Sequence, residues 1–397
     1  MPLRIAGYTE AQLRDHVAMI APMPEPCAAA DGADFVEAWT VEASQDSYVC
    51  DVAYAEIDGL PVVVAGVGNT VTVWDLESGA RLSGSPGPEP EPEPEPELEP
   101  EPGAASASSS ADLACVAVTQ SAGKPVAVTG DIDGRIRTWE LLPCGAAPLG
   151  EPLTVLGGRV HALAATRGAG CGLVLIARGA GETSTVYSVP VADQTVEVWD
   201  IATRMRLRVL HHGGYTGSVA LGEGDGRAVA VASASFSASP LVDASDLESR
   251  IFLWDLETGD RIGEPLEPAH EGESIGSVAV GSVAGRTIVV GASDGRLHVW
   301  ERGEVRPSAQ ISDAGGVEFV AWGGTGDRPL VLAGGGGDPR RPDRRSRLRV
   351  WDPRDWRLLG EIEPGFGVLR RFASAPDGRV ILPWAGSVKV LRYVGGA

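Results

Sequence analysis

The sequence is poor in the residues that build disulfide frameworks and metal centres. Its 397 residues include only five cysteines and six histidines. The cysteines are widely spaced, and no Cys-x-x-Cys or His-x-x-x-His pair occurs. Neither a disulfide framework nor a zinc site is therefore expected, and reduced thiols in a cytoplasmic protein without a cofactor or metal are the simplest expectation.

Long apolar runs and an excess of basic charge are also lacking. No stretch of the sequence reaches the roughly 18 apolar residues that a membrane helix needs. Residues 1–22 lack the continuous apolar core of a secretion signal. The formal net charge is −21, whereas binding to nucleic acid or to anionic lipid requires clustered Lys and Arg. We therefore expect neither a nucleic acid nor a membrane as partner.

What the chain does contain is a short apolar segment that ends in tryptophan and recurs six times. The tryptophans are Trp74, Trp139, Trp199, Trp254, Trp300 and Trp351. A seventh, degraded copy is Val388–Arg392, in which Leu391 takes the place of tryptophan. The distance between copies varies, with a minimum near the period of about 40 residues that is typical of a four-stranded propeller blade.

One repeat is complete enough to assign all four strands. Arg261–Leu266 is expected to be a short outer strand, and Ser277–Val280 the inner strand that follows it. Thr287–Val290 and Leu297–Trp300 complete the blade, with turn residues between the strands. The sequence thus predicts an all-β fold, a seven-bladed β-propeller of four-stranded antiparallel blades that spans residues 34–397.

These repeats resemble WD40 repeats over nearly the whole chain. The blades are rich in Ala and Gly, as in Val278–Gly281, and in this composition they look like bacterial members of that family. The resemblance implies a buried network of His, Ser or Thr, Asp and Trp in each blade, and a task as a scaffold or sensor module. His298 lies at a position that varies between the copies, which we interpret as permissive. The residues that match the network are Thr129, Asp133, Trp139, Asp193, Trp199, His212, Trp254, His270, Asp294 and Trp300.

The last copy leaves no room for a fourth strand before Ala397. The alternating run Phe35–Val41 is predicted to supply that strand, so that the N-terminal strand closes the ring and removes an exposed edge. Leu3–Ile5 is a competing candidate. Residues 1–33 are expected to form an N-terminal extension with a short helix over 9–20, which either packs on the propeller or serves as a hook for a partner.

Four insertions interrupt the repeat, at residues 83–111, 178–192, 234–247 and 335–347. In a propeller all four leave from the rim where the inner strands begin, which we call the top rim. Long loops on a rigid scaffold commonly bind partners. The alternative is drift, because surface loops tolerate insertion at little cost.

The insertions differ in chemistry. Residues 84–111 alternate Glu and Pro and then Ser and Ala, and are expected to be disordered. Residues 338–349 hold six arginines, which either stay solvated, contact the Glu-Pro tract, or bind an acidic partner, phosphate or RNA. The other two insertions carry aromatic residues, or fold back as an extra hairpin. Candidate partner-binding residues are Arg159, Tyr187, Tyr215, Phe236, Arg340, Arg341, Arg344 and Arg345.

No catalytic motif stands out. Neither a Gly-x-Ser-x-Gly elbow nor a phosphate-binding loop with its Lys-Ser/Thr occurs. The sequence therefore favours a monomeric, non-catalytic scaffold or sensor that binds a protein or peptide on its top rim. The alternative is an enzyme or small-ligand binder that uses the mouth of the axial channel.

Overall fold

The computed structural model describes residues 35–43, 49–82, 112–154, 159–165, 172–178, 195–224, 226–237, 247–270, 272–293, 295–301, 303–311, 317–325, 327–335, 346–365, 371–384 and 386–393. The chain divides after Ala33, and all of these residues belong to the second unit, Asp34–Ala397. The predicted helix 9–20 and the competing strand Leu3–Ile5 lie outside the described residues. Among the described residues, no helix is long and apolar enough to cross a membrane.

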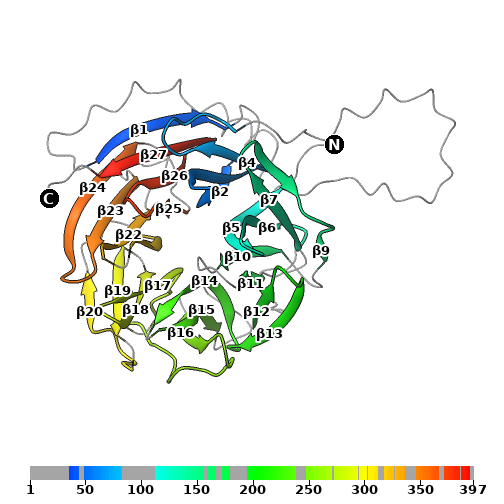
Figure 1. Cartoon of the computed structure of the whole chain (residues 1–397). Helices are drawn as coiled ribbons and strands as arrows, with labels where there is room; N and C mark the ends of the chain where they lie inside the picture. The colour runs from blue at the N-terminus through cyan, green and yellow to red at the C-terminus, as the bar shows by residue number, and fades with distance from the viewer. Residues whose placement is uncertain are drawn as a thin grey trace, which may run out of the picture. The chain divides into compact units, whose positions relative to one another are not determined.

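Seven antiparallel sheets form a closed ring, which confirms the predicted propeller (Figure 1). We number the blades in chain order and give their strands from the axis outward. Blades 1 to 3 are β2 (Val49–Ile57), β3 (Leu60–Val67) and β4 (Thr70–Asp75); β5 (Leu113–Ser121), β6 (Lys124–Asp131), β7 (Arg135–Leu142) and β8 (Gly145–Pro148), with β9 (Leu153–Thr154) also on β7; and β10 (Val160–Ala165), β11 (Leu173–Arg178), β12 (Thr195–Asp200) and β13 (Met205–His211).

The remaining blades repeat the pattern, and the innermost strand of each blade contacts the innermost strands of its two neighbours. Blades 4 to 7 are β14 (Tyr215–Gly224), β15 (Arg227–Ser237) and β16 (Leu247–Asp255); β17 (Ser277–Val283), β18 (Arg286–Ser293), β19 (Arg296–Glu301) and β20 (Ala309–Ile311); β21 (Phe319–Gly324), β22 (Pro329–Gly335), β23 (Ser346–Asp352) and β24 (Arg357–Gly365); and β25 (Ala373–Ser374), β26 (Val380–Trp384), β27 (Ser387–Tyr393) and β1 (Phe35–Glu42).

The outer strand expected at Arg261–Leu266 is reduced to two isolated bridges, from Arg261 to Trp254 and from Leu266 to Ile251. Gly263 adopts a positive φ of 70°, and Pro265 has no N–H to donate. Both features interrupt a ladder of hydrogen bonds. The segment therefore follows the edge of blade 4 without forming a continuous strand.

The recurrent tryptophans join neighbouring blades. Trp74 is buried in a cluster that contains Ile381 and Val390 of blade 7, and Trp300 in one that contains Val231 of blade 4. The other four likewise pack in clusters with apolar side chains of the preceding blade. Burial of a large aromatic side chain between two sheets contributes a few kcal/mol, so the repeat marks the seams of the ring.

The acidic residue after the tryptophan has a separate task. The Asp75 Oδ1 atom accepts the backbone N–H of Ser78 at 2.7 Å, and Asp255 Oδ1 accepts that of Glu257 at 2.9 Å. Asp200 and Asp352 accept equivalent bonds. Carboxylates at the start of a turn satisfy N–H groups that no strand reaches. The Trp-Asp pair thus fixes the seam between blades and the tight turn that follows it.

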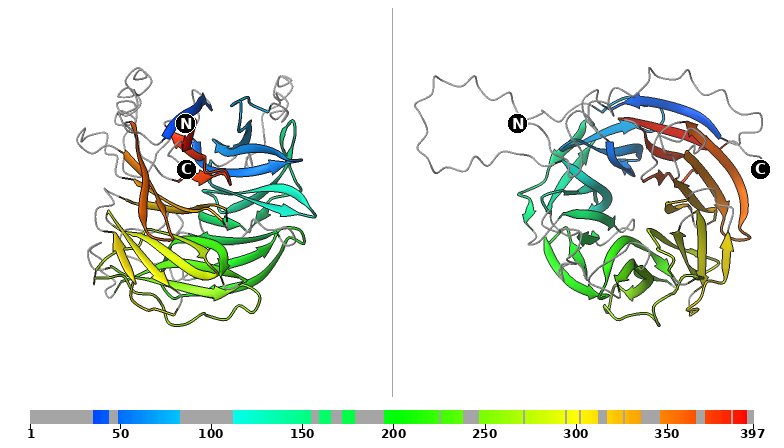
Figure 2. Two further views of the ribbon diagram at one scale, coloured as in Figure 1. Left: turned by 60° about the vertical axis from the view of Figure 1, so that its left-hand side comes forward. Right: turned by 180° about the vertical axis from the view of Figure 1, so that it is seen from behind.

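The N-terminal strand closes the ring, as predicted. β1 pairs antiparallel with β27, from Phe35 opposite Tyr393 to Glu42 opposite Ser387. It is the outermost strand of blade 7, and the two strands run side by side in both views of the ring (Figure 2). Blade 7 is therefore built from both ends of the propeller.

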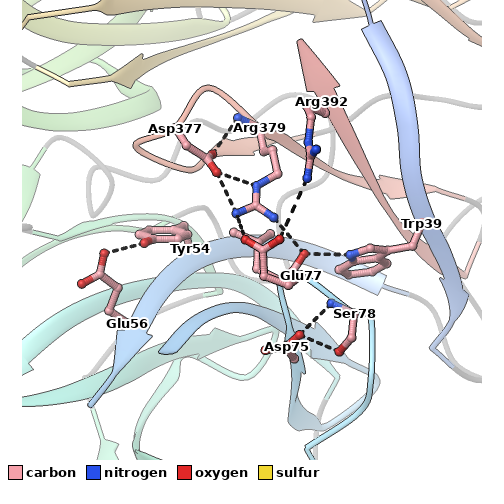
Figure 3. Close-up of polar contacts among 10 residues, drawn as sticks. Trp39, Tyr54, Glu56, Asp75, Glu77, Ser78, Asp377, Arg379 and Arg392 are labelled. Atoms are coloured by element: carbon pink, nitrogen blue, oxygen red, sulfur yellow. Dashed lines mark hydrogen bonds and ion pairs between the residues drawn. The ribbon is translucent and has the colours of Figure 1, made fainter. Parts of the chain in front are cut away.

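A polar latch holds this mixed blade to blade 1 (Figure 3). The Arg379 guanidinium, with only 6% of its side chain exposed, contacts Glu77 at 2.5 Å and Asp377 at 2.7 Å. Its Nη1 also donates to the Leu76 carbonyl at 3.2 Å. Trp39 Nε1 of β1 donates to the same carbonyl at 2.8 Å. The turn after β4 is thereby bound to β1 and to the turn before β26.

Deletion of residues 35–42 should destabilise the whole ring, because it opens blade 7 and exposes the edge of β27. We expect the free energy of unfolding to fall by more than about 3 kcal/mol, the usual cost of losing one buried aromatic side chain. Trp39→Phe is the matched control: it keeps the strand, loses the bond to Leu76 and should cost about 1 kcal/mol. Urea denaturation measures both, and an unchanged unfolding midpoint in the deletion variant would contradict the closure.

Candidate functional site at the top rim

The top rim is defined in the structure by the starts of the inner strands. Val160 at the start of β10 pairs with Arg178 at the end of β11, and Thr195 at the start of β12 pairs with His211 at the end of β13. By the same topology, the gaps between β15 and β16 and between β22 and β23 open at this rim, and the segment before β5 enters there. Three of the four insertions therefore leave and re-enter the ring at this rim, and the fourth re-enters there.

The opposite rim, the bottom rim, has short connections. Asp58–Gly59, Ala122–Gly123 and Ala284–Gly285 are two-residue turns between β2 and β3, β5 and β6, and β17 and β18. All six residues have positive φ between 49° and 81°. This is the backbone of the tightest hairpin turns, which match the twist of the strands. The two rims thus differ in what they offer a partner.

At the top rim a chain of polar contacts connects blades across the ring. Arg371, just before β25 of blade 7, has its Nη1 3.4 Å from Asp51 Oδ2 of blade 1. Its Nη2 donates to the His161 carbonyl of blade 3 at 2.7 Å. The His161 ring in turn contacts the Thr216 carbonyl of blade 4 at 2.8 Å. We call Asp51, Arg371, His161 and Thr216 the axial cluster.

Asp51 is the buried anion of the axial cluster. Its Oδ1 accepts the N–H of Val52 at 2.9 Å, and its Oδ2 accepts the N–H of Val116 in blade 2 at 3.0 Å. Burial raises the pKa of this carboxyl, whereas Arg371 and the two N–H donors act to lower it. The carboxylate ties blades 1, 2 and 7 together and is itself fully engaged.

His161 and His212 flank Thr216 and are both held neutral. His161 bonds to the Thr216 carbonyl, which can only accept, so its Nε2 carries the proton. His212 Nε2 lies 2.8 Å from Thr216 Oγ1. Burial lowers the pKa of each imidazole to about 4. Neither ring is therefore charged at neutral pH.

Three of the candidate partner-binding residues lie in the described part. Arg159 is exposed directly before β10, and Tyr215 is half-buried at the start of β14. Phe236 was expected on a loop but belongs to β15, opposite Glu248. Its ring lies 6.1 Å from that of Phe252, below the guanidinium of Arg250. The other five lie outside the described residues: Tyr187, Arg340, Arg341, Arg344 and Arg345.

The predicted boundary of the third insertion, residues 234–247, was also wrong, because β15 and β16 extend into it. Residues 234–237 and 247–250 pair as continuations of β15 and β16. Alternation of small and aromatic residues, Ala-Ser-Phe-Ser, is as compatible with a strand as with a loop. The alternative of a hairpin extension describes these flanks better than a free loop does.

The expected blade networks take several forms. In blade 2, Trp139 Nε1 donates to Thr129 Oγ1 at 2.9 Å. The buried carboxylate beside them is Asp131, which accepts the N–H groups of Asp133 and Arg135. Asp133 itself is exposed. We expected Asp133 in the network, but the structure places Asp131 there. The two aspartates are two residues apart, and the sequence around either one is compatible with a turn.

Blades 3 and 4 show two further variants. Trp199 Nε1 donates to Glu197 Oε2 at 2.8 Å, a contact that the sequence pattern does not contain, while Asp193 lies outside the described residues. In blade 4 the His212 ring bonds to Thr216 and lies 6.5 Å from the Trp254 ring. The aromatic ring is the common element, and its polar partner changes from blade to blade.

Blade 5 overturns two expectations. His270 is exposed and contributes its backbone N–H, which donates to Glu273 Oε2 at 3.0 Å. His298, interpreted as permissive, is wholly buried and stacks on Trp300 at 5.7 Å. Its Nε2 lies 3.5 Å from Glu273, and Trp300 Nε1 donates to the Glu267 carbonyl at 3.1 Å. Variation between copies was a poor guide because each blade buries a different polar set. Asp294 lies outside the described residues.

Comparison with known proteins supports the fold. No family model and no curated protein matches the chain. Among solved structures, the WD40 repeats of RRP9 superpose with a TM-score of 0.59 at 16% identity, covering 90% of this chain and 97% of that one. The U3-55K structure gives 0.58 at 16%, covering 90% and 98%. The chain therefore has the seven-bladed fold of WD40-repeat propellers.

Asp51→Asn should destabilise the protein, because it leaves Arg371 without its buried anion and turns an amide donor toward the N–H of Val116. Breaking one partner of a buried pair typically costs about 3–5 kcal/mol. The double variant Asp51→Asn/Arg371→Gln should cost less than the two single variants together. Chemical denaturation of all three tests this, and strictly additive losses would contradict the coupling.

Acidification should weaken the fold through His161 and His212. Their pKa is about 4 in the folded protein and about 6.5 in an unfolded chain. Between these values the unfolded chain binds protons that the folded protein excludes, so stability is lost as the pH falls.

The measurement is the melting temperature between pH 7 and pH 4 for the wild type, His161→Gln and His212→Gln. Each variant removes one titrating group, so its melting temperature should fall less steeply than that of the wild type. Parallel curves of melting temperature against pH would contradict the assignment. Carboxylates that titrate in the same pH range affect the wild type and the variants alike, so their effect cancels when the curves are compared.

Proposed function

We propose that this propeller is a non-catalytic scaffold or sensor module that binds a protein or peptide partner on its top rim. The observation that carries the proposal is the asymmetry of the ring. The connections at the bottom rim are two to seven residues long and include three two-residue turns with positive φ, whereas the long insertions open at the top rim. Insertions on a rigid scaffold vary its surface without disturbing its core.

The axial cluster favours binding over catalysis at the same rim. A general acid or base needs a free proton-transfer atom with a pKa near the working pH. Asp51 is occupied by two N–H donors and Arg371, and the His161 proton is held by a carbonyl while its pKa lies near 4. These groups support a rigid rim better than they support the alternative, an enzyme or a small-ligand binder at the axis.

The expectations about setting belong to the same proposal. We propose a monomer in the cytoplasm, of bacterial character, whose partner is a protein or peptide and not a nucleic acid or membrane. The strongly negative net charge supports this choice, because polyanions are repelled over the range of a Debye length.

The test is recovery of a partner with tagged full-length protein from the native host, followed by calorimetry with the purified partner. A variant in which short Gly-Ser linkers replace residues 181–192 and 337–344 should lose the partner, while its melting temperature stays close to that of the wild type. The matched control carries Lys124→Ser and Arg286→Ser on the bottom rim. Equal affinity of the trimmed variant and the control would overturn the top rim as the binding surface.

A further inference from the structure

We infer that the axial end of the top rim is a carboxylate-recognition site, in which Arg371 and Arg159 bind one acidic side chain or the C-terminal carboxylate of a peptide. This inference rests on the proposed function and names the chemistry of the partner. Neither residue belongs to the tryptophan repeat or to an insertion. The structure brings them to one place because they precede inner strands of different blades, β25 and β10.

Arg371 is oriented before any ligand arrives. Its two contacts, to Asp51 Oδ2 and to the His161 carbonyl, come from blades 1 and 3 and fix the plane of the guanidinium. The Arg371 side chain is nevertheless 31% exposed, whereas that of Asp51 is 5% exposed. A guanidinium has five N–H donors, of which these contacts use two. The remaining N–H donors of Arg371 are therefore held in place by the fold, so a ligand that binds them costs little additional side-chain entropy.

Arg159 supplies the uncompensated charge. It is exposed, and no hydrogen bond or ion pair joins it to another residue in the described part of the chain. Its position two residues before His161 places it near the carbonyl that Arg371 binds. Both cations act on the same buried groups, His161 and Cys115. The positive charges of Arg371 and Arg159 therefore both act at the start of β10, where Arg371 binds the His161 carbonyl.

The charge balance indicates a carboxylate. Asp51 offsets Arg371, and His161 is neutral, so the axial cluster with Arg159 carries one net positive charge. A carboxylate matches this charge, and its planar oxygens match the fork of a guanidinium. A phosphate dianion or an RNA chain brings more negative charge to a protein whose formal charge is −21, so repulsion offsets more of its binding.

The experiment uses fluorescein-labelled octapeptides with a Gly-Ser background and the full chain at low ionic strength. One peptide carries a central Glu and an amidated C-terminus, the second a central Gln and a free C-terminus, and the third a central Gln and an amide. Fluorescence anisotropy measures the affinity. We expect saturable binding of the first or second peptide, which tells a side-chain carboxylate from a terminal one, and none of the third.

Arg159→Gln is the decisive variant, because it changes an exposed side chain that has no hydrogen-bond or ion-pair partner among the described residues. It should weaken binding of the charged peptide about tenfold, the effect of losing one charge-assisted contact. Arg371→Gln should weaken it at least as much. Arg286→Gln, which removes an exposed arginine of the bottom rim, should leave the affinity within about twofold.

Three results would overturn the inference: binding that survives Arg159→Gln, equal binding of the uncharged peptide, or failure of both charged peptides to bind. Tighter binding of inorganic phosphate or of a short RNA at the same ionic strength would also overturn the assignment to a carboxylate. If Arg159→Gln still captures the native partner and the loop-trimmed protein does not, the proposed function stands and the carboxylate site falls.

Discussion

Each blade of this protein depends on packing one large apolar side chain against the blade before it: the recurrent tryptophan in six blades and Leu391 in blade 7. A single four-stranded sheet of this length has two apolar faces and no core of its own, so it becomes stable only between two neighbours. In an open row of sheets, the first and the last sheet would each lack a neighbour on one face. The pairing of β1 with β27, and the latch of Arg379 on Glu77 and Leu76, supply the missing neighbour for blades 7 and 1.

The closed ring places polar groups from distant parts of the sequence at one end of the axis. Asp51 and Arg371 are separated by 320 positions yet lie in contact. The His161 carbonyl accepts a hydrogen bond from Arg371, which is 210 positions away. Because its residues lie on the inner strands or directly before them and contact one another, this cluster belongs to the ring and not to an insertion. A partner that approaches the top rim meets both the insertions and this ordered group of charges.

The blade networks show how far a repeat constrains its members. The tryptophan is kept in six copies, while its hydrogen-bond acceptor is Thr129 in blade 2, Glu197 in blade 3 and a backbone carbonyl in blade 5. The tryptophan N–H needs only some acceptor within reach, so the acceptor can change from blade to blade. The packing of the ring between two sheets depends on its shape, so the tryptophan itself is kept. A motif therefore located the blades better than it located their polar contacts, as Asp133 and His298 demonstrate.

The sequence alone determined the number of blades and the seams, because periodicity and strand alternation are local properties of the chain. It offered two candidates for the closing strand, of which the structure shows Phe35–Glu42. Neither Arg371 nor Asp51 stood out in the sequence, because neither belongs to the repeated motif or to an insertion. Whether a charged side chain meets a partner depends on which blades face each other across the axis, and that is decided only when the ring closes. The tertiary structure therefore decided the candidate site, through contacts between residues that no spacing in the sequence connects.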